Sequence, residues 1–405
     1  MTPSVSRLFC PWIVAMLHAS RATAGVWGMD PVLGFAADYS TNPVLLAIPD
    51  TAQADAAVLI DDPTTYNADN ERLTLEPSFR LSNRSGYSSV TSDYEHFLVK
   101  NELDTQRSVF TAVGGVDQDS SLFHDFLTNG STGVKRDTAL ADLNWDLHLT
   151  ERFEFDVDLS PSRVRYAQGA TIENLVDYKN IGIAPSITWL SDERTKVSLS
   201  AEVGRYNSLN GMTESRNVNL QAGFTRRLSE IWTLSVTAGF SRALNRSSLE
   251  EEFVVETPTG PAIEIIPVNF ESAQNGAVYL VNAVRQGSQL SLNASASRQL
   301  APTGFAFLSR QDTLDLTANY LLSDRWSIGG DAKRVKYQSP GTGGTSTEVD
   351  VSYLTFNADW KWTEHWTVIF AASHVASKYS STAYSAKSNE ITLTLSRQFN
   401  HIAFD

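Results

Sequence analysis

The sequence predicts an all-β protein: a transmembrane, antiparallel, up-and-down β-barrel of 16–18 strands with short periplasmic turns and long extracellular loops. Three observations predict this fold. Apolar and polar residues alternate over segments of about ten residues, the length of strand that crosses a bilayer at a tilt. A short turn-like element recurs about every forty residues. Seven of the nine tryptophans lie within a few residues of that element.

The composition limits the classes of function. The chain has 405 residues, a formal net charge of −14 and one cysteine, Cys10. Nucleic-acid binding needs a basic surface, so the acidic balance argues against it. No CxxC motif or Cys/His cluster offers ligands for zinc or an iron–sulfur cluster, and we expect no metal or cofactor. After residue 24 no run of about 18 apolar residues occurs, which excludes spanning helices.

The N-terminus has the pattern of an export signal. Arg7 precedes an apolar stretch over 8–17, and small residues follow up to Ala24. This order predicts a signal peptide over 1–24, cleaved near Ala24 after Sec export. The remainder, 25–405, is predicted to be one barrel domain in the bacterial outer membrane. Cleavage would remove Cys10, so the mature domain would contain no disulfide.

Strands are predicted wherever apolar residues recur at every second position. Leu73, Leu75, Phe79 and Leu81, for example, share one face of a strand. The predicted strands lie at 31–40, 72–81, 139–148, 153–159, 197–203, 218–224, 232–240, 290–296, 314–320, 354–360, 366–372 and 391–399. A soluble β-sandwich or an extracellular β-helix would alternate too, but neither explains the positions of the turns and the tryptophans.

Two kinds of connection alternate between these strands. The short element places Ser, Thr or Asp between two strands, as a tight hairpin turn requires. It occurs at 149–153, 190–194, 228–232, 322–326 and 362–366, with divergent copies at 103–107 and 286–288. The other connections are long and polar, and they lie at 117–135, 167–176, 207–216, 243–276, 339–346 and 378–388. This asymmetry is typical of an outer-membrane barrel.

Tryptophans near one end of the strands predict an aromatic girdle, because indole prefers the headgroup region. They are Trp145, Trp189, Trp232, Trp326, Trp360, Trp362 and Trp366.

The segment 391–399 resembles the terminal strand through which the barrel-insertion machinery recognises its substrates. It departs from that signal because Arg397 interrupts the outward face and six residues follow Phe399.

The strand number depends on the N-terminal region. Seven short turns give 16 strands that begin near residue 70. If 31–40 also belongs to the wall, then 41–69 is an outer loop and one more strand is required, for which 83–92 is available. We favour this 18-stranded arrangement, because 25–69 would otherwise be a periplasmic N-terminal segment, a strap or a plug.

A barrel of this size leaves a water-filled lumen. Alternation turns charged side chains of both signs inward, which predicts a hydrated pore without strong ion selectivity. The predicted lumen-lining residues are Arg72, Glu76, Arg80, Asp142, Asp146, Glu154, Asp156, Asp158, Lys196, Glu202, Arg227, Asp315, Asp331, Lys333, Asp359 and Lys361. The simpler interpretation is that these charges only solvate a wide lumen.

Catalytic and metal sites are not expected. His124 and His374 are the only histidines near the outer side with neighbours that could serve a surface hydrolase, and each is isolated. The acidic run 250–252 and the pair Asp117 and Asp119 lack the rest of a calcium loop, so solvated loops are the better interpretation.

The segment 34–43, Gly-Phe-Ala-Ala-Asp-Tyr-Ser-Thr-Asn-Pro, resembles the first strand and loop of a group of bacterial outer-membrane porins. The segment 73–79 and the repeated Leu-Thr-Glu-Arg-Phe and Leu-Ser-Asp-Arg-Trp turns are similar to theirs too. Members of this group are often linked to the export of exopolysaccharide or capsule. The resemblance implies polysaccharide-export components as partners, beside outer-membrane lipid and the insertion machinery.

The predicted function is therefore a porin-like channel for hydrophilic solutes or exported polysaccharide. A structural or adhesive barrel, whose loops (above all 243–276) bind a surface partner, is the main alternative. An outer-membrane hydrolase is a more remote one.

Overall fold

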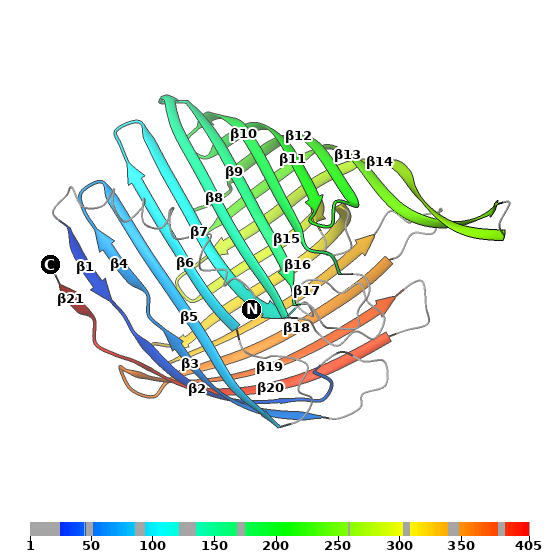
Figure 1. Ribbon diagram of the computed structural model, residues 1–405. Helices are drawn as coiled ribbons and strands as arrows, with labels where there is room; N and C mark the ends of the chain where they lie inside the picture. The colour runs from blue at the N-terminus through cyan, green and yellow to red at the C-terminus, as the bar shows by residue number, and fades with distance from the viewer. Residues whose placement is uncertain are drawn as a thin grey trace.

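The computed structural model describes residues 25–43, 45, 52–85, 94–120, 135–167, 175–257, 260–302, 308–338, 348–379 and 385–404. They form one antiparallel sheet that closes on itself (Figure 1). The strands before the midpoint of the chain are β1 (Val26–Met29), β2 (Val32–Ser40), β3 (Gln53–Asp61), β4 (Thr64–Asn67), β5 (Glu71–Ser85), β6 (Tyr94–Asp104), β7 (Ser108–Ser120), β8 (Lys135–Thr150), β9 (Phe153–Tyr166) and β10 (Tyr178–Asp192). The others are β11 (Thr195–Ser208), β12 (Thr213–Arg227), β13 (Trp232–Thr257), β14 (Gly260–Gln286), β15 (Leu290–Pro302), β16 (Leu308–Ser323), β17 (Trp326–Gln338), β18 (Glu348–Lys361), β19 (Trp366–Tyr379), β20 (Ser385–Gln398) and β21 (Ile402–Phe404).

The wall has 18 strands, because three of its strands are each made of two segments. β1 continues into β2, β3 into β4 and β20 into β21, and both members of each pair lie beside the same neighbouring strands. The barrel closes where β2 pairs with β20, with Phe35 opposite Leu395. The predicted fold class is confirmed, with 18 rather than 16 strands. No helix in the described residues is long and apolar enough to cross a membrane.

The second wall strand differs from the predicted one. It runs through β3 and β4 over 53–67, so the connection after β2 covers 41–52 and not 41–69. Residues 83–85 of the predicted strand 83–92 belong to β5, and the rest lie outside the described residues. The alternation over 53–61 was missed because small alanines replace large apolar residues there, and because Asp62 and Pro63 interrupt the strand. An eighth short turn, at 68–70, follows from this correction.

Five of the eight short turns share one hydrogen-bond pattern, which explains the recurring element. A Ser or Thr hydroxyl accepts a hydrogen bond from the backbone N–H three residues later. The acceptor–donor pairs are Thr105 and Ser108 (2.9 Å), Thr150 and Phe153 (3.1 Å), Ser229 and Trp232 (3.2 Å), Ser323 and Trp326 (3.2 Å), and Thr363 and Trp366 (3.1 Å). The hydroxyl satisfies a donor that the tight turn leaves unpaired.

Two of the predicted long loops are mostly strand. Residues 207–216 contain only a four-residue connection at 209–212, in which Gly211 takes a positive φ of 76° that suits glycine. The described residues of 243–276 lie in β13 and β14, which are 26 and 27 residues long and form a hairpin that projects beyond the wall (Figure 1). The β-branched residues at 254–255 and 263–268 favour this extension of the ladder.

The projecting hairpin pairs unevenly with its neighbours. β13 and β14 face each other from Trp232 and Arg285 to Thr257 and Gly260. β14 pairs with β15 over eight residue pairs only, from Tyr279 and Arg298 to Gln286 and Ser291. The outer part of β14 therefore leaves the wall while β15 remains in it.

The outward faces carry large exposed apolar side chains such as Leu220, Phe240 and Leu354. Tryptophans border this band at the short-turn end, where the rings of Trp326 and Trp360 stack with centroids 5.5 Å apart. This arrangement is an aromatic girdle at the membrane interface, as predicted.

The terminal strand continues past Phe399. Phe399 N–H donates to the Pro31 carbonyl (2.9 Å), after which β21 pairs with β1 and the Phe404 ring stacks on Trp27. Arg397 does lie on the outward face, and its guanidinium group sits over the rings of Phe399 (4.9 Å) and Trp366 (5.6 Å). A cation–π contact of this kind keeps the charge within the aromatic girdle.

Candidate functional site: the inner wall of the barrel

Cross-strand register determines which side chains face the lumen, because residues opposite each other share a face. Val157 lies opposite Trp145, on the outward face, whereas Asp156 lies opposite Asp146 on the inward face. Followed around the wall, the register turns every charged residue that we predicted to line the lumen inward. Whether these residues contact a solute stays a prediction.

One part of the inner wall is strongly acidic. We call it the carboxylate sector, and it consists of Asp142, Asp146, Glu154, Asp156, Asp158 and Glu202. Asp156 accepts a hydrogen bond from the Asn144 amide (2.5 Å), and Lys196 Nζ lies 3.3 Å from Glu154 Oε2. With six carboxylates and one lysine, this sector is strongly negative, although the sequence predicted charges of both signs in the lumen and no strong ion selectivity.

The three predicted lumen residues of β5, near the seam where β2 meets β20, differ in their contacts and exposure. Arg80 forms ion pairs with Asp38, on β2, and Asp55, on β3, and its side chain is only 17% exposed. Arg72 and Glu76, nearer the short turns, are exposed to the lumen. Arg80 therefore joins strands of the wall, while its two neighbours on β5 remain free to meet a solute.

A third group lies on β16, β17 and β18. Asp315 is opposite Lys333, and Asp331 accepts a hydrogen bond from Thr317 (2.9 Å). Asp359 accepts one from Ser327 (3.1 Å). The exposed side chains of Lys361 and Arg227 lie near the short turns of their strands. Charges of both signs occur in this group, as the sequence predicted for the lumen.

The sequence reasoning missed a neutral sector, because it looked for charges only. Apart from Arg227, the described inward side chains of β12 to β15 carry no charge. Its hydroxyl and amide side chains include Ser215, Asn217, Asn219, Gln221, Ser235, Thr237, Ser241, Asn245, Gln274, Asn282 and Asn293. Ser, Thr and Asn at every second position of these strands are the sequence signal that would have revealed the neutral sector. Asn282 and Asn293, with Thr317 and Asn319 of β16, line a hollow of about 250 Å³.

Several polar atoms of this neutral sector have no hydrogen-bond partner among the described residues. They are Ser215 Oγ, Asn219 Oδ1, Ser241 Oγ, Gln274 Oε1, Asn282 Oδ1 and both amide atoms of Asn245. A buried polar atom without a partner costs free energy. These atoms therefore leave hydrogen-bonding capacity unused within the part of the wall that the structure describes.

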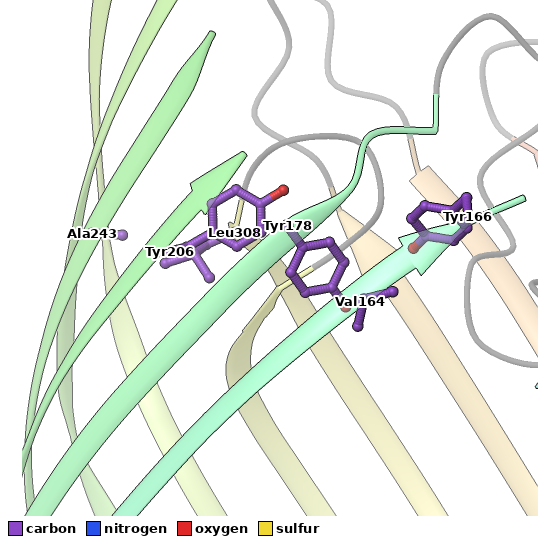
Figure 2. Close-up of a cluster of buried hydrophobic side chains, with 6 residues drawn as sticks. All are labelled: Val164, Tyr166, Tyr178, Tyr206, Ala243 and Leu308. Carbon is purple, nitrogen blue, oxygen red and sulfur yellow. The ribbon is translucent and has the colours of Figure 1, made fainter. Parts of the chain in front are cut away.

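The lumen is lined by apolar residues toward the long-loop end. Tyr166, Tyr178 and Tyr206 form a buried cluster there with Val164, Ala243 and Leu308 (Figure 2). The rings of Tyr178 and Tyr206 lie 5.1 Å apart. Because β16 is three strands beyond β13 in the wall, the start of β16 must lean over the lumen for Leu308 to join this cluster.

A second apolar cluster lies across the wall. Val349 and Val351 are fully buried on the inward face of β18, and Leu45, from the connection after β2, packs against them. Inward side chains nearer the short turns, such as Glu76, are exposed instead. Inward side chains in the outer half of the barrel are therefore more buried than those near the short turns.

The remaining candidates have ordinary contacts. His374 faces outward and its Nδ1 lies 2.8 Å from Asn389 Oδ1, whereas His124 lies outside the described residues. Asp117 and Asp119 belong to β7, not to a loop, and Asp119 forms a bidentate ion pair with Arg136 (2.8 Å for both contacts). Among the described residues, no three or more His, Cys, Asp or Glu side chains are arranged so that they could hold a metal ion.

No family model matches the sequence, and no curated protein matches it. Solved structures with a similar fold include the ferric citrate transporter FecA (10% identity, 91% of this chain and 79% of that chain covered, TM-score 0.49). The outer membrane protein OpdK from Pseudomonas aeruginosa is another (8% identity, 93% and 99% covered, TM-score 0.45). A third is OccK2 from the same organism, solved in complex with glucuronate (9% identity, 92% and 98% covered, TM-score 0.45). These are outer-membrane β-barrel proteins. At identities this low, the likeness says nothing about the substrate.

Proposed function

We propose that the protein is an outer-membrane channel that passes hydrophilic solutes through its lumen. The observation that carries this proposal is a closed barrel of 18 strands whose inward face is polar on nearly every strand. Barrels of 16 to 18 strands enclose an aqueous channel, whereas those of about eight are filled by their own side chains.

Single-channel recording in planar bilayers tests this proposal. The purified protein, shown to be folded by heat-modifiable migration on gels, should produce stepwise openings. Protein that has been boiled before reconstitution serves as the control and should produce none. A folded sample without openings at any voltage would contradict the channel function while leaving the barrel intact.

We further propose that the transported solutes include exported polysaccharide, the more specific function that the sequence resemblance implies. The neutral sector supports this, because hydroxyl and amide groups match the hydrogen bonding of sugar hydroxyls. A neutral oligosaccharide should then interrupt the current through the open channel. Replacing Asn282 and Asn293, which line the hollow, by alanine should shorten these interruptions, whereas alanine at the outward-facing Ser352 should not.

The export route is part of the same proposal. The signal peptide over 1–24 lies outside the described residues, and cleavage near Ala24 would be read from the N-terminal sequence of protein extracted from outer membranes. The terminal strand, which ends at the wall with β21 beside β1, would be the segment that the insertion machinery binds. Polysaccharide-export components remain proposed partners.

The projecting β13–β14 hairpin favours a second candidate, an adhesive barrel. Deletion of 250–266 should then abolish attachment to a surface partner and leave the conductance unchanged. If the deletion alters the conductance alone, the adhesive function is wrong.

A further inference from the structure

Four arginines gather on the outward face of the barrel at its long-loop end. We call Arg205, Arg216, Arg242 and Arg246 the arginine patch; they lie on β11, β12 and β13. Arg205 is directly opposite Arg216, and Arg242 is opposite Val218, one outward position below Arg216 on β12. Arg246 is opposite Glu214, which lies one outward position above Arg216 on β12. The four side chains are therefore neighbours on one surface.

The patch carries more positive charge than its own carboxylates neutralise. Glu214 Oε1 lies 3.1 Å from Arg205 Nε and 2.9 Å from Arg216 Nε, so one carboxylate serves two arginines. Glu271 pairs with Arg246 (2.9 Å), and Arg242 has no ion pair among the described residues. Four arginines against two carboxylates leave an excess of two positive charges, in a chain whose net charge is −14. Like charges directly opposite each other destabilise a sheet, so a further anion between them would be favourable.

Another part of the same rim has more of its positive charge neutralised. On β15 to β18, Arg298 pairs with Asp312 (2.9 Å), Arg334 with Asp350 (2.9 Å) and Lys336 with Glu348 (2.9 Å). We call these three cations the paired rim, because each has a carboxylate oxygen 2.9 Å away. Arg310 also lies 3.8 Å from Asp312, so four cations share three carboxylates there. The paired rim is therefore nearer to neutral than the arginine patch.

The position of the patch decides which anion it fits. Directly below it, on the same outward face, lie Val218 and Phe240, whose side chains are 54% and 55% exposed, together with Val203 and Leu220. This apolar surface belongs to the band that meets acyl chains. Arg216 and Arg246 are 60% and 65% exposed above it. A ligand that covers both surfaces has acyl chains and a phosphate-bearing headgroup, and the guanidinium fork binds phosphate oxygens in pairs.

We propose that the arginine patch binds the anionic headgroup of a phosphorylated lipid in the outer leaflet. The phosphate lies between the arginines and the acyl chains lie along the apolar surface of β11 to β13. The inference needs only a barrel that spans a membrane, so it stands whether or not the lumen conducts polysaccharide.

Native mass spectrometry of the full-length folded protein in a neutral detergent tests the proposal, with cardiolipin as a probe that carries two phosphates. The wild type should retain cardiolipin in preference to phosphatidylcholine. The triple variant Arg205→Gln, Arg216→Gln, Arg242→Gln should bind it about tenfold more weakly, as the loss of charge-assisted hydrogen bonds implies.

The matched control removes the same number of positive charges from the paired rim, through Arg298→Gln, Arg334→Gln and Lys336→Gln. It should retain cardiolipin like the wild type. Equal losses of cardiolipin binding in the two triple variants would show that only the net charge matters, and would overturn the site. A wild type that does not prefer cardiolipin would overturn it too. Inorganic phosphate should not displace the lipid; displacement at equal concentration would assign the patch to free phosphate instead. Heat-modifiable migration of each variant separates loss of binding from loss of folding.

Discussion

Arg80 illustrates how a single charged residue serves the wall and not the lumen. Its guanidinium group lies on the inward face, as alternation predicted, but the register between β2, β3 and β5 places two aspartates beside it. The sequence could predict that Arg80 faces inward, because the alternation of side chains along a strand can be seen in the neighbouring residues alone. It could not predict the partners, because the pairing of 38 with 55 depended on a strand, 53–61, that alanines conceal.

Replacing Arg80 by glutamine should destabilise the barrel by about 3 kcal/mol, because Asp38 would remain nearly buried without its counter-charge. Unfolding by urea in lipid vesicles measures the change. Arg72→Gln, on the same face of the same strand but exposed, is the control and should have little effect. Similar losses in both variants would show that Arg80 is not held by these carboxylates.

Tyr206 is fully buried in the apolar cluster at the long-loop end of the lumen. Tyr206→Ala should increase the single-channel conductance, because it removes a ring from the apolar cluster in the outer half. Tyr279→Ala removes a ring from the outward face and should leave the conductance unchanged. An unchanged current in Tyr206→Ala would show that this apolar cluster does not limit the flow of ions.

The short turns are the elements that the sequence predicted best. All seven predicted turns connect neighbouring strands in the structure. In five of them a Ser or Thr hydroxyl accepts the backbone N–H three residues later, which is a local motif. The long connections were predicted less well. The acidic run at 250–252 suggested a loop, yet the β13–β14 ladder continues through it, and only the pairing of two distant segments reveals that.

Ser323→Ala should therefore lower the free energy of unfolding by about 1 kcal/mol, the usual contribution of one such hydrogen bond. Ser323→Thr keeps the hydroxyl and should restore the stability. Urea titration with both variants provides the measurement. If alanine and threonine behave alike, the turn does not depend on this hydrogen bond.

At the scale of the whole molecule, the lumen is divided into sectors of different charge. The sequence predicted both signs but not their segregation, because assigning charges to neighbouring strands requires the register around the barrel. The carboxylate sector should make the channel prefer cations, since fixed negative charges concentrate them in the lumen.

Neutralising Asp142, Asp156 and Glu202 as amides should lower the ratio of cation to anion permeability, measured from reversal potentials across a salt gradient. The effect should weaken as the ionic strength of both solutions rises, because salt screens charges in water. Asp359→Asn, outside the carboxylate sector, should change the ratio far less. An unchanged ratio in the triple variant would mean that the sector does not line the ion path.

β14 and β15 are joined by eight residue pairs only, and this short ladder determines where the barrel would open first. A closed sheet has no free edge until one ladder separates, and this ladder is shorter than those beside it. Heat or mechanical force should therefore unzip the wall between Tyr279 and Arg298, starting at the outer rim where the hairpin has already left. The two edges released there could pair with another copy of the chain. Aggregation of heated protein would then begin at a joint far from the seam where the first and last strands meet.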